Sequence, residues 1–128
     1  MRIVVDTNVY ISALVFNKTI QELLNSLLEQ HTILISEFIT NELSRKLISK
    51  FNLNSQEVDV LIRQLLSITL KITPIGNAPQ VARDNDDNQI LHLAEFANAD
   101  LIISGDKDLL SLVSYKSIPI LKPSDLFS

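Results

Sequence analysis

Short apolar runs and helical stripes alternate along this chain. Residues 3–5, 32–35 and 101–103 are apolar runs rich in β-branched residues, and each predicts a buried strand. Between the first two runs, leucine and isoleucine recur at the i, i+3, i+4, i+7 and i+8 spacing of one helix face. The residues of that face are Ile20, Leu23, Leu24, Leu27 and Leu28. The pattern therefore predicts a strand, a helix and a second strand at the start of the chain.

Three more apolar stripes predict helices later in the chain. Ser36 and Ser55 stand just before the first two stripes, at positions where a side-chain oxygen caps a helix. A polar run at residues 83–88 leads into the third stripe, as a loop followed by a helix. The three stripes comprise Ile39, Leu43 and Leu47; Val58, Leu61, Ile62, Leu65 and Leu66; and Ile90, Leu91, Leu93, Ala94 and Ala97.

Two segments that contain proline, residues 71–75 and 118–121, are predicted to be short or edge strands, because proline lacks the N–H that a central strand donates. Strands that alternate with helices predict an α/β fold, a three-layer α/β/α sandwich with a central parallel sheet. The chain has no linker, repeat or low-complexity tract, so residues 1–128 are expected to form a single domain. In such folds, ligands bind at the carboxyl ends of the strands.

The composition narrows the chemistry of any site. The chain has no cysteine, which excludes disulfides, thiolate catalysis and zinc sites built on sulfur, and its two histidines make a weak imidazole set. The net charge of −4 argues against nucleic-acid binding through overall charge and leaves local basic patches open. No apolar run is long enough to cross a membrane, and an acid at position 6 comes too early for a signal peptide. A cytoplasmic protein without membrane association is expected.

Four acids lie in separate segments that the predicted fold brings toward one edge of the sheet. Asp6 and Asp106 follow predicted strands, Glu42 lies at the border of a buried helix stripe, and Asp87 shares a helix face with Leu91. Carboxylates that meet in one crevice repel one another strongly unless a divalent cation holds them. Convergence of these four acids would therefore indicate a metal site.

Each acid also has a structural explanation by itself. Asp6 is a favoured residue for capping a helix, and Asp87 in a first helical turn interacts favourably with the helix dipole. A charge at the border of an apolar stripe, such as Glu42, is common, and a solvated turn accounts for Asp106 or Asp108. The residue pattern alone leaves these explanations open.

The order of the acids and their neighbours resembles the PIN domain family over nearly the whole chain. The blocks that carry the resemblance read Ile-Val-Val-Asp-Thr-Asn-Val from position 3, Ser-Glu-Phe-Ile-Thr-Asn-Glu-Leu from 36, Arg-Asp-Asn-Asp-Asp-Asn-Gln-Ile-Leu from 83, and Asp-Leu-Ile-Ile-Ser-Gly-Asp-Lys-Asp-Leu-Leu from 100. The tail at residues 118–127 is similar to the subgroup of toxins from toxin/antitoxin pairs. Asn85 stands where this subgroup often has proline, and Ser104 where threonine is usual; loop geometry and a hydroxyl are preserved.

The resemblance implies roles for particular residues. The catalytic, metal-binding acids would be Asp6, Glu42, Asp87 and Asp106, with Asp108 as a weaker fifth ligand. Supporting roles would fall to Thr7, Asn8, Asn88 and Ser104. The implied protein is a divalent-metal-dependent endoribonuclease, the toxin of a type II toxin/antitoxin pair, with RNA as substrate, an antitoxin protein as partner and a homodimer as assembly. Basic residues near the acids are candidates for RNA contacts: Arg45, Lys46, Lys50, Arg83 and Lys107.

The ligand type also points to a mechanism. Hard carboxylate oxygens without cysteine or a histidine cluster favour Mg²⁺ or Mn²⁺, and a metal-activated water would then hydrolyse the phosphodiester bond. A haloacid-dehalogenase-like phosphatase also opens with a strand and an aspartate over Mg²⁺, but it needs a second aspartate two residues on, where this chain has Asn8. An RNA-binding or partner-binding module without turnover stays open as an alternative.

Overall fold

The computed structural model describes residues 1–126 and contains a six-stranded sheet in the order β3-β2-β1-β4-β6-β5. Five strands are parallel, and β5 pairs with β6 in antiparallel orientation. The predicted α/β fold is therefore confirmed, with a mostly parallel sheet. The strands are β1 (Arg2–Val5), β2 (Thr32–Ile35), β3 (Leu70–Lys71), β4 (Leu101–Ile103), β5 (Ser114–Tyr115) and β6 (Ile118–Leu121). Phe127, in the tail segment discussed above, lies outside the described residues.

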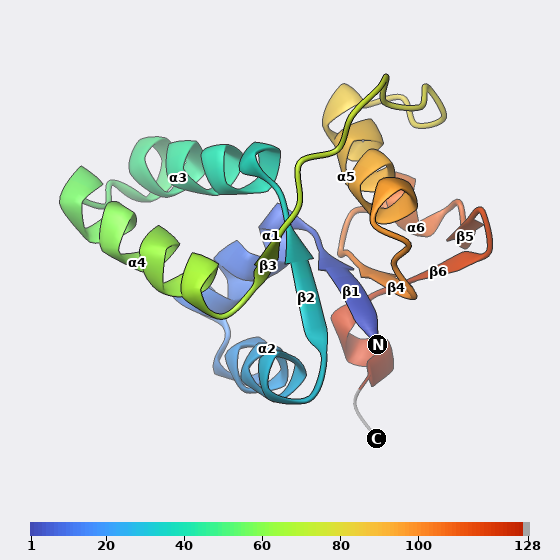
Figure 1. Ribbon diagram of the computed structural model, residues 1–128. Helices are drawn as coiled ribbons and strands as arrows, with labels where there is room; N and C mark the ends of the chain where they lie inside the picture. The colour runs from blue at the N-terminus through green and yellow to red at the C-terminus, as the bar shows by residue number, and fades with distance from the viewer. Residues whose placement is uncertain (127–128) are drawn as a thin grey trace.

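Helices cover both sides of the sheet. In Figure 1, α2, α3 and α4 lie on one side of the strands, and α5 and α6 lie on the other. Right-handed crossovers require this arrangement, because the chain moves outward from β1 to β3 and then returns to β4. The helices are α1 (Thr7–Ile11), the π-helical turn η1 (Ser12–Phe16), α2 (Lys18–Gln30), α3 (Glu37–Phe51), α4 (Ser55–Ser67), α5 (Asn85–Phe96), α6 (Lys107–Leu110) and the 3₁₀ turn η2 (Pro123–Leu126).

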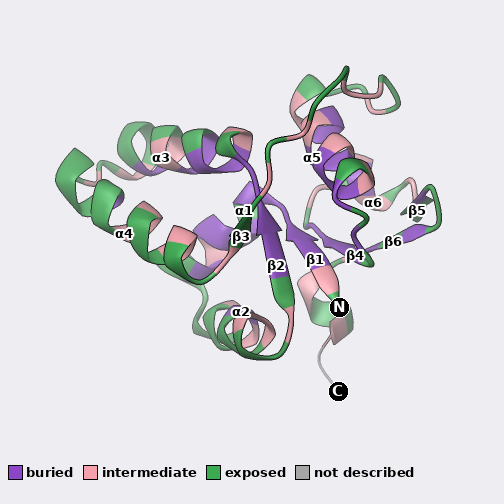
Figure 2. Cartoon of the chain, viewed as in Figure 1, coloured by how far each residue is buried: buried purple, intermediate pink, exposed green. Residues whose placement is uncertain are grey.

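The core lies on both faces of the sheet, mainly between the strands and the helices α1, α3 and α5. Val4 is buried between its neighbours in register, Leu34 and Ile102, because the central parallel strands are covered on both faces. The predicted stripes of α3 and α5 are buried in full, whereas α2 and α4 each bury one residue fully and pack the rest partly. Figure 2 shows this difference, with buried residues gathered on the strands and on the inner sides of α3 and α5. Among residues 1–126, no helix has the length and apolar character needed to cross a bilayer.

Two strand predictions are corrected by the structure. Residues 118–121 do form a strand, but β5 lies outside it, so the strand is not at the edge. The hairpin is hidden in the sequence because its turn places Lys116 and Ser117 at φ of 48° and 68°, values that usually favour glycine or asparagine. Pro119 is tolerated because pairing with β4 begins one residue later, at Ile120. In the segment 71–75, only Lys71 belongs to the edge strand β3.

The cap of α4 is a further correction. Ser55 is the first residue of the helix, and the preceding Asn54 is the cap: its Oδ1 accepts a hydrogen bond from the Gln56 N–H at 2.7 Å. By contrast, Ser36 caps α3 as predicted, because its Oγ accepts a bond from the Ile39 N–H. Asparagine and serine are about equally good caps, so the sequence did not distinguish the two neighbours at α4.

This assignment predicts opposite results for two neighbouring substitutions. Asn54→Ala should lower the free energy of unfolding by about 0.5–2 kcal/mol, because the first turn of α4 loses its capping acceptor. Ser55→Ala, the matched control, should change it by less than about 0.5 kcal/mol, since this side chain is exposed and caps nothing. Urea denaturation followed by circular dichroism measures both values, and a larger loss for Ser55→Ala would contradict the assignment.

Candidate active site

Three of the acids come together where β1 and β4 end side by side. Asp6 directly follows β1, and its N–H donates to the carbonyl of Ile103, the last residue of β4, at 2.9 Å. Asp106 lies three residues after the end of β4. Asp87 belongs to the first turn of α5, which packs against β1. The parallel pairing of two neighbouring strands therefore gathers acids that are up to one hundred residues apart in the chain.

Ser104 connects Asp6 to Asp106. Its Oγ donates to Asp6 Oδ2 at 2.7 Å and accepts from the Asp106 N–H at 3.0 Å, and the side chain is completely buried. Asp6 occupies the cap position of α1, yet its side chain makes no capping bond. Burial raises the pKa of Asp6, an effect that the Ser104 hydrogen bond opposes and the charge of Asp106 reinforces. The helix-cap explanation of Asp6 thus does not describe its side chain.

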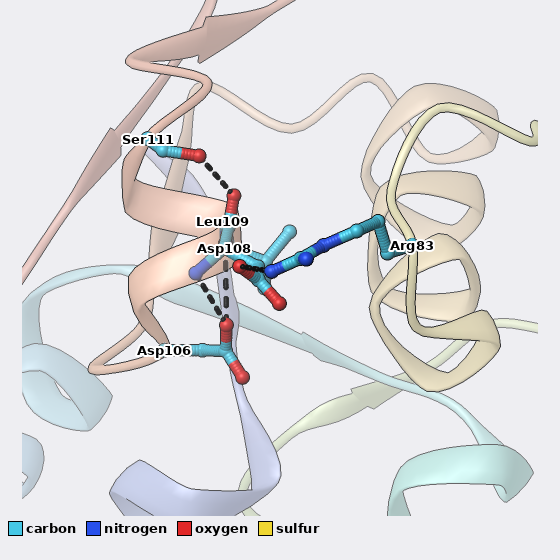
Figure 3. A network of polar contacts seen from close by, with 5 residues as sticks. All are labelled: Arg83, Asp106, Asp108, Leu109 and Ser111. Carbon is cyan, nitrogen blue, oxygen red and sulfur yellow. Dashed lines mark hydrogen bonds and ion pairs between the residues drawn. The ribbon is translucent and has the colours of Figure 1, made fainter.

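Asp106 does cap a helix. Its Oδ1 accepts from the N–H groups of Asp108 and Leu109 at 2.8 and 3.3 Å, at the start of α6. Figure 3 shows this bond pair and the second carboxylate oxygen pointing away from the helix. The same view shows Arg83 reaching across from the loop before α5 to Asp108, where its Nη2 lies 3.0 Å from Oδ1. One oxygen of Asp106 is therefore used in folding, and the other faces the site.

Among the acids of the site, Asp87 has the fewest favourable partners. Its side chain is only 5% exposed, and its buried Oδ2 has no hydrogen-bond partner among the described residues. Burial, followed by the charges of Asp106 and Asp6, raises the pKa of Asp87 to about 7. One carboxylate oxygen from each of Asp87, Asp106 and Asp108 lies within 4.8 Å of the others. An unpartnered buried oxygen beside other acids indicates a place that a cation would complete.

Glu42 lies beside this cluster, on α3. It is outside the group of three acids with oxygens within 4.8 Å, and its Oε2 lies 3.9 Å from Lys46 Nζ. Burial raises the pKa of Glu42 and nearby Asp86 raises it further, while the neighbouring Thr7 hydroxyl and Lys46 lower it. Lys46 also lowers the pKa of Asp6, so its ammonium lies near both Glu42 and Asp6.

The other predicted supporting residues have different neighbours. Asn8 accepts a hydrogen bond from Lys46 Nζ at 3.2 Å, and Thr7 is buried with a hydroxyl that makes no hydrogen bond of ordinary geometry. Asn88 holds the loop before α5: its Oδ1 accepts from the N–H groups of Val81 and Ala82, and its Nδ2 donates to the Ala82 carbonyl. Asn88 therefore positions the segment from which Arg83 reaches the acids.

The basic residues predicted to contact RNA fall into two groups. Lys46 and Arg83 are already paired with acids, Glu42 and Asp108 respectively. The remaining three are exposed: Arg45, Lys50 and Lys107.

Asp86 is a neighbour of the site that the sequence reasoning missed. It lies beside Glu42 and contributes to the raised pKa of that residue. Three acids lie close together at the start of α5: Asp84, Asp86 and Asp87. They differ in the direction that each side chain takes around the helix. Asp84 caps the helix by accepting from the Asp86 N–H at 2.9 Å. The helical spacing that placed Asp87 on the face of Leu91 separates it from Asp86, but only the fold shows that Asp86 lies beside Glu42 of α3.

The acids fit a hard divalent cation. The donor set is entirely carboxylate oxygen, which suits Mg²⁺ or Mn²⁺, and Asp87 has an oxygen that no protein group uses. A cation there would offset the repulsion that raises the pKa of Asp87.

The unusual pKa of Asp87 predicts a pH effect on stability. Its folded-state value of about 7 exceeds the ordinary 3.8, so the metal-free folded protein holds a proton that the unfolded chain releases between these pH values. Stability from this group is therefore lost as the pH rises through that window. Asp87→Asn should melt at a higher temperature than wild type at pH 8 in EDTA, with the difference vanishing below pH 4.

Asp59→Asn serves as the control, because Asp59 is exposed on α4 away from the site. Thermal melts of the three proteins between pH 4 and pH 8 make the comparison. A mutant at Asp87 that is less stable than wild type at pH 8 would mean that this carboxylate has a favourable partner in the fold.

Comparison with known proteins places the chain in a family. The PIN domain sequence model matches residues 2–108. An uncharacterized protein of Methanocaldococcus jannaschii is 34% identical over 118 residues, which cover 88% of this chain and 75% of the relative. The fold is similar to the crystal structure of VapBC2 from Rickettsia felis bound to a DNA fragment from their promoter, with a TM-score of 0.65 and 14% identity over 95% of this chain and 98% of that chain. The chain belongs to the PIN domain family, whose members are nucleases that generally use divalent metals.

Proposed function

We propose that this protein is a divalent-metal-dependent endoribonuclease. The observation that carries the proposal is the cluster of Asp87, Asp106 and Asp108, in which a buried carboxylate oxygen lacks any partner. The cluster lies at the carboxyl ends of β1 and β4, where α/β folds of this kind bind ligands. Membership of the PIN family removes the haloacid-dehalogenase alternative.

In this proposal, the acids divide the work. Asp87 and Asp106 would hold Mg²⁺ or Mn²⁺, joined by Asp108 if its ion pair with Arg83 opens; the bound cation would supply positive charge to the phosphate and lower the pKa of a water molecule. Ser104 holds Asp6 beside Asp106, and Glu42 lies on α3 next to Lys46; burial raises the pKa of both acids, so we assign them to accept the proton of the attacking water. Ser104 fixes the orientation of Asp6 through its 2.7 Å hydrogen bond.

RNA is the proposed substrate, cut within unpaired segments. The PIN resemblance supports this choice, and exposed basic residues supply positive charge: Lys107 adjoins Asp106 in the chain, and Arg45 and Lys50 lie on α3 with Glu42. Arg83 is proposed to move from Asp108 to a phosphate of the substrate, because a cation on Asp108 would compete with its ion pair.

Cleavage of RNA tests the proposal. The purified protein should cut single-stranded RNA with Mg²⁺ or Mn²⁺ and stop when EDTA is added. Asp106→Asn should lower the rate by more than about a hundredfold, because even partners one step removed from a metal cost 10–100-fold. Asparagine retains an acceptor for capping α6, so the mutant should stay folded.

Two serines provide a matched pair for the same assay. Ser104→Ala should lower the rate by about 10–100-fold by releasing Asp6, whereas Ser111→Ala removes only a bond from an exposed hydroxyl to the Asp108 carbonyl and should leave it unchanged. Gel-resolved cleavage of a labelled RNA measures all rates. RNA binding without cleavage under every metal condition would favour a module without turnover, and cleavage that survives EDTA would exclude the metal mechanism.

We further propose that the chain is the toxin of a type II toxin/antitoxin pair and assembles as a homodimer. Fold similarity to VapBC2 supports the proposal. An apolar hollow of about 190 Å³ between α2 and α4, with walls that include Leu28, Leu61 and Leu65, offers a surface for an antitoxin segment.

Light scattering tests the assembly. At micromolar concentration the protein should have about twice the 14.4 kDa mass of one chain, because homo-oligomers with two-fold symmetry are the commonest assembly. Dilution series identify a dimer by a concentration-dependent mass. A constant mass of one chain over that range would exclude the homodimer.

A further inference from the structure

A groove leads away from the acidic cluster on the side of α1. One hollow of about 200 Å³ includes Asp106, Asn8 and Ser12 in its walls, and a second of about 240 Å³ shares Asn8 and Ser12 and continues to Phe16 and Phe51. The two hollows adjoin at Asn8 and Ser12, which line both of them, and together they are here called the side groove. It connects a carboxylate of the cluster to a pair of aromatic rings.

The aromatic end of the side groove is open to solvent. Phe16 is 68% exposed and ends the π-helical turn η1, and its ring centroid lies 5.2 Å from that of Phe51 in an edge-to-face contact. A single exposed phenylalanine is ordinary on a protein surface. Here the contact with Phe51 holds the exposed ring in place at the end of a groove, and π-helical turns are frequent at functional sites.

Two lysines of α3 line the same groove. Lys46 and Lys50 both contact it and lie one helical turn apart, after Glu42 on the same face, with about 6 Å of rise between successive residues of the series. Lys46 bonds Asn8 and Glu42, while Lys50 is exposed and makes no ion pair within residues 1–126. The charge along this face thus changes from negative at Glu42 to positive near the aromatic pair.

This combination matches a single strand of nucleic acid better than a protein partner. Sites for unpaired strands combine cations that follow the phosphates with aromatic rings on which bases stack. The core of a protein interface is instead depleted in lysine. The groove also begins at Asp106, so any chain that fills it lies next to the proposed cleavage point.

We propose that the side groove binds the unpaired nucleotides adjacent to the cleaved phosphate, with one base stacked on Phe16 and the phosphates on either side of it held by Lys46 and Lys50. This inference rests on the proposed ribonuclease function and adds a specificity to it. Stacking accepts any base but needs an unpaired one, so a duplex is excluded from the groove because its bases stack on each other. Because a base must be unpaired to stack on Phe16, the protein selects flexible or looped segments, with little sequence preference.

RNA affinity in EDTA tests the groove without turnover. Fluorescence anisotropy of a short labelled single-stranded RNA measures the dissociation constant. Phe16→Ala and Phe16→Leu should both weaken binding by between about fivefold and a hundredfold, the effect of losing one aromatic platform, whereas Phe16→Trp should retain it. Leucine keeps the apolar surface and removes the ring, so it separates stacking from general hydrophobic contact.

Further variants test the contribution of lysine charge to RNA binding and control for the position of the substituted residue. Lys50→Gln should weaken binding of all sequences alike and reduce the salt dependence by about one phosphate contact. Lys71→Gln and Phe96→Ala remove an exposed lysine from β3 and an exposed aromatic ring from α5, and both should bind RNA as wild type does. An unlabelled duplex of the same sequence should compete far less well than the single strand.

The outcomes separate this inference from the proposed function. Wild type that binds and cleaves RNA, with Phe16→Ala unchanged in both, would overturn the side groove alone. Binding that depends on Phe16 without cleavage in any metal would retain the groove and overturn the ribonuclease. Absence of both binding and cleavage would overturn both. A changed molecular mass of Phe16→Ala in light scattering with unchanged RNA affinity would assign the ring to a protein interface and overturn the groove.

Discussion

The parallel pairing of β1 with β4 is the constraint on which the site depends. The two strands are far apart in the chain, yet their register places Val5 beside Ile103, and the next residues after each strand form the site. The hydrogen bond from the Asp6 N–H to the Ile103 carbonyl extends this pairing by one residue. Ser104 follows β4 directly, and its side chain contacts both Asp6 and Asp106, so the strand register also fixes the positions of these acids. Apolar packing thus determines where the polar chemistry lies.

The fold tolerates a repulsion that it does not remove. Asp6 and Asp87 are both buried with raised pKa values, and each is affected by the charge of Asp106. Asp106 is partly compensated by two backbone N–H groups of α6, and Asp108 by Arg83, while Asp87 Oδ2 has no partner. Functional sites often lower the stability of the ligand-free protein in this way. Binding of a cation to the acids would stabilise the folded state again. The buried apolar stripes of α3 and α5 stabilise the fold and offset the free-energy cost of the repulsion between the acids.

Sequence patterns predicted the central strands and buried helix faces better than the hairpin and the helix caps. Apolar runs and stripes located the three central strands and the buried faces of α3 and α5, because burial leaves a strong periodic signal. They did not reveal the β5 hairpin, since its turn uses Lys116 and Ser117 where glycine is the usual signal. They also did not separate Asn54 from Ser55 as a cap, because both residues have suitable side chains.

The same limits apply to the site. The sequence identified acids that the fold brings together, but it could not show that Glu42 is outside the three-acid cluster and lies next to Lys46 and Asp86. It also could not show that Asp106 has a dual position, as a helix cap and as a member of the cluster. These distinctions depend on the directions of individual side chains, which the spacing of residues does not determine.

The most direct test of a metal site among these acids is anomalous diffraction from crystals grown with Mn²⁺. We expect one strong peak in coordinating contact with Asp87 and Asp106, with the oxygen of Asp87 that lacks a partner as a ligand. A second peak near Asp6 would fit a two-ion site. Crystals soaked to saturation that show no peak between Asp87 and Asp106, or an ion bound only elsewhere, would contradict the claim that these acids form a metal centre.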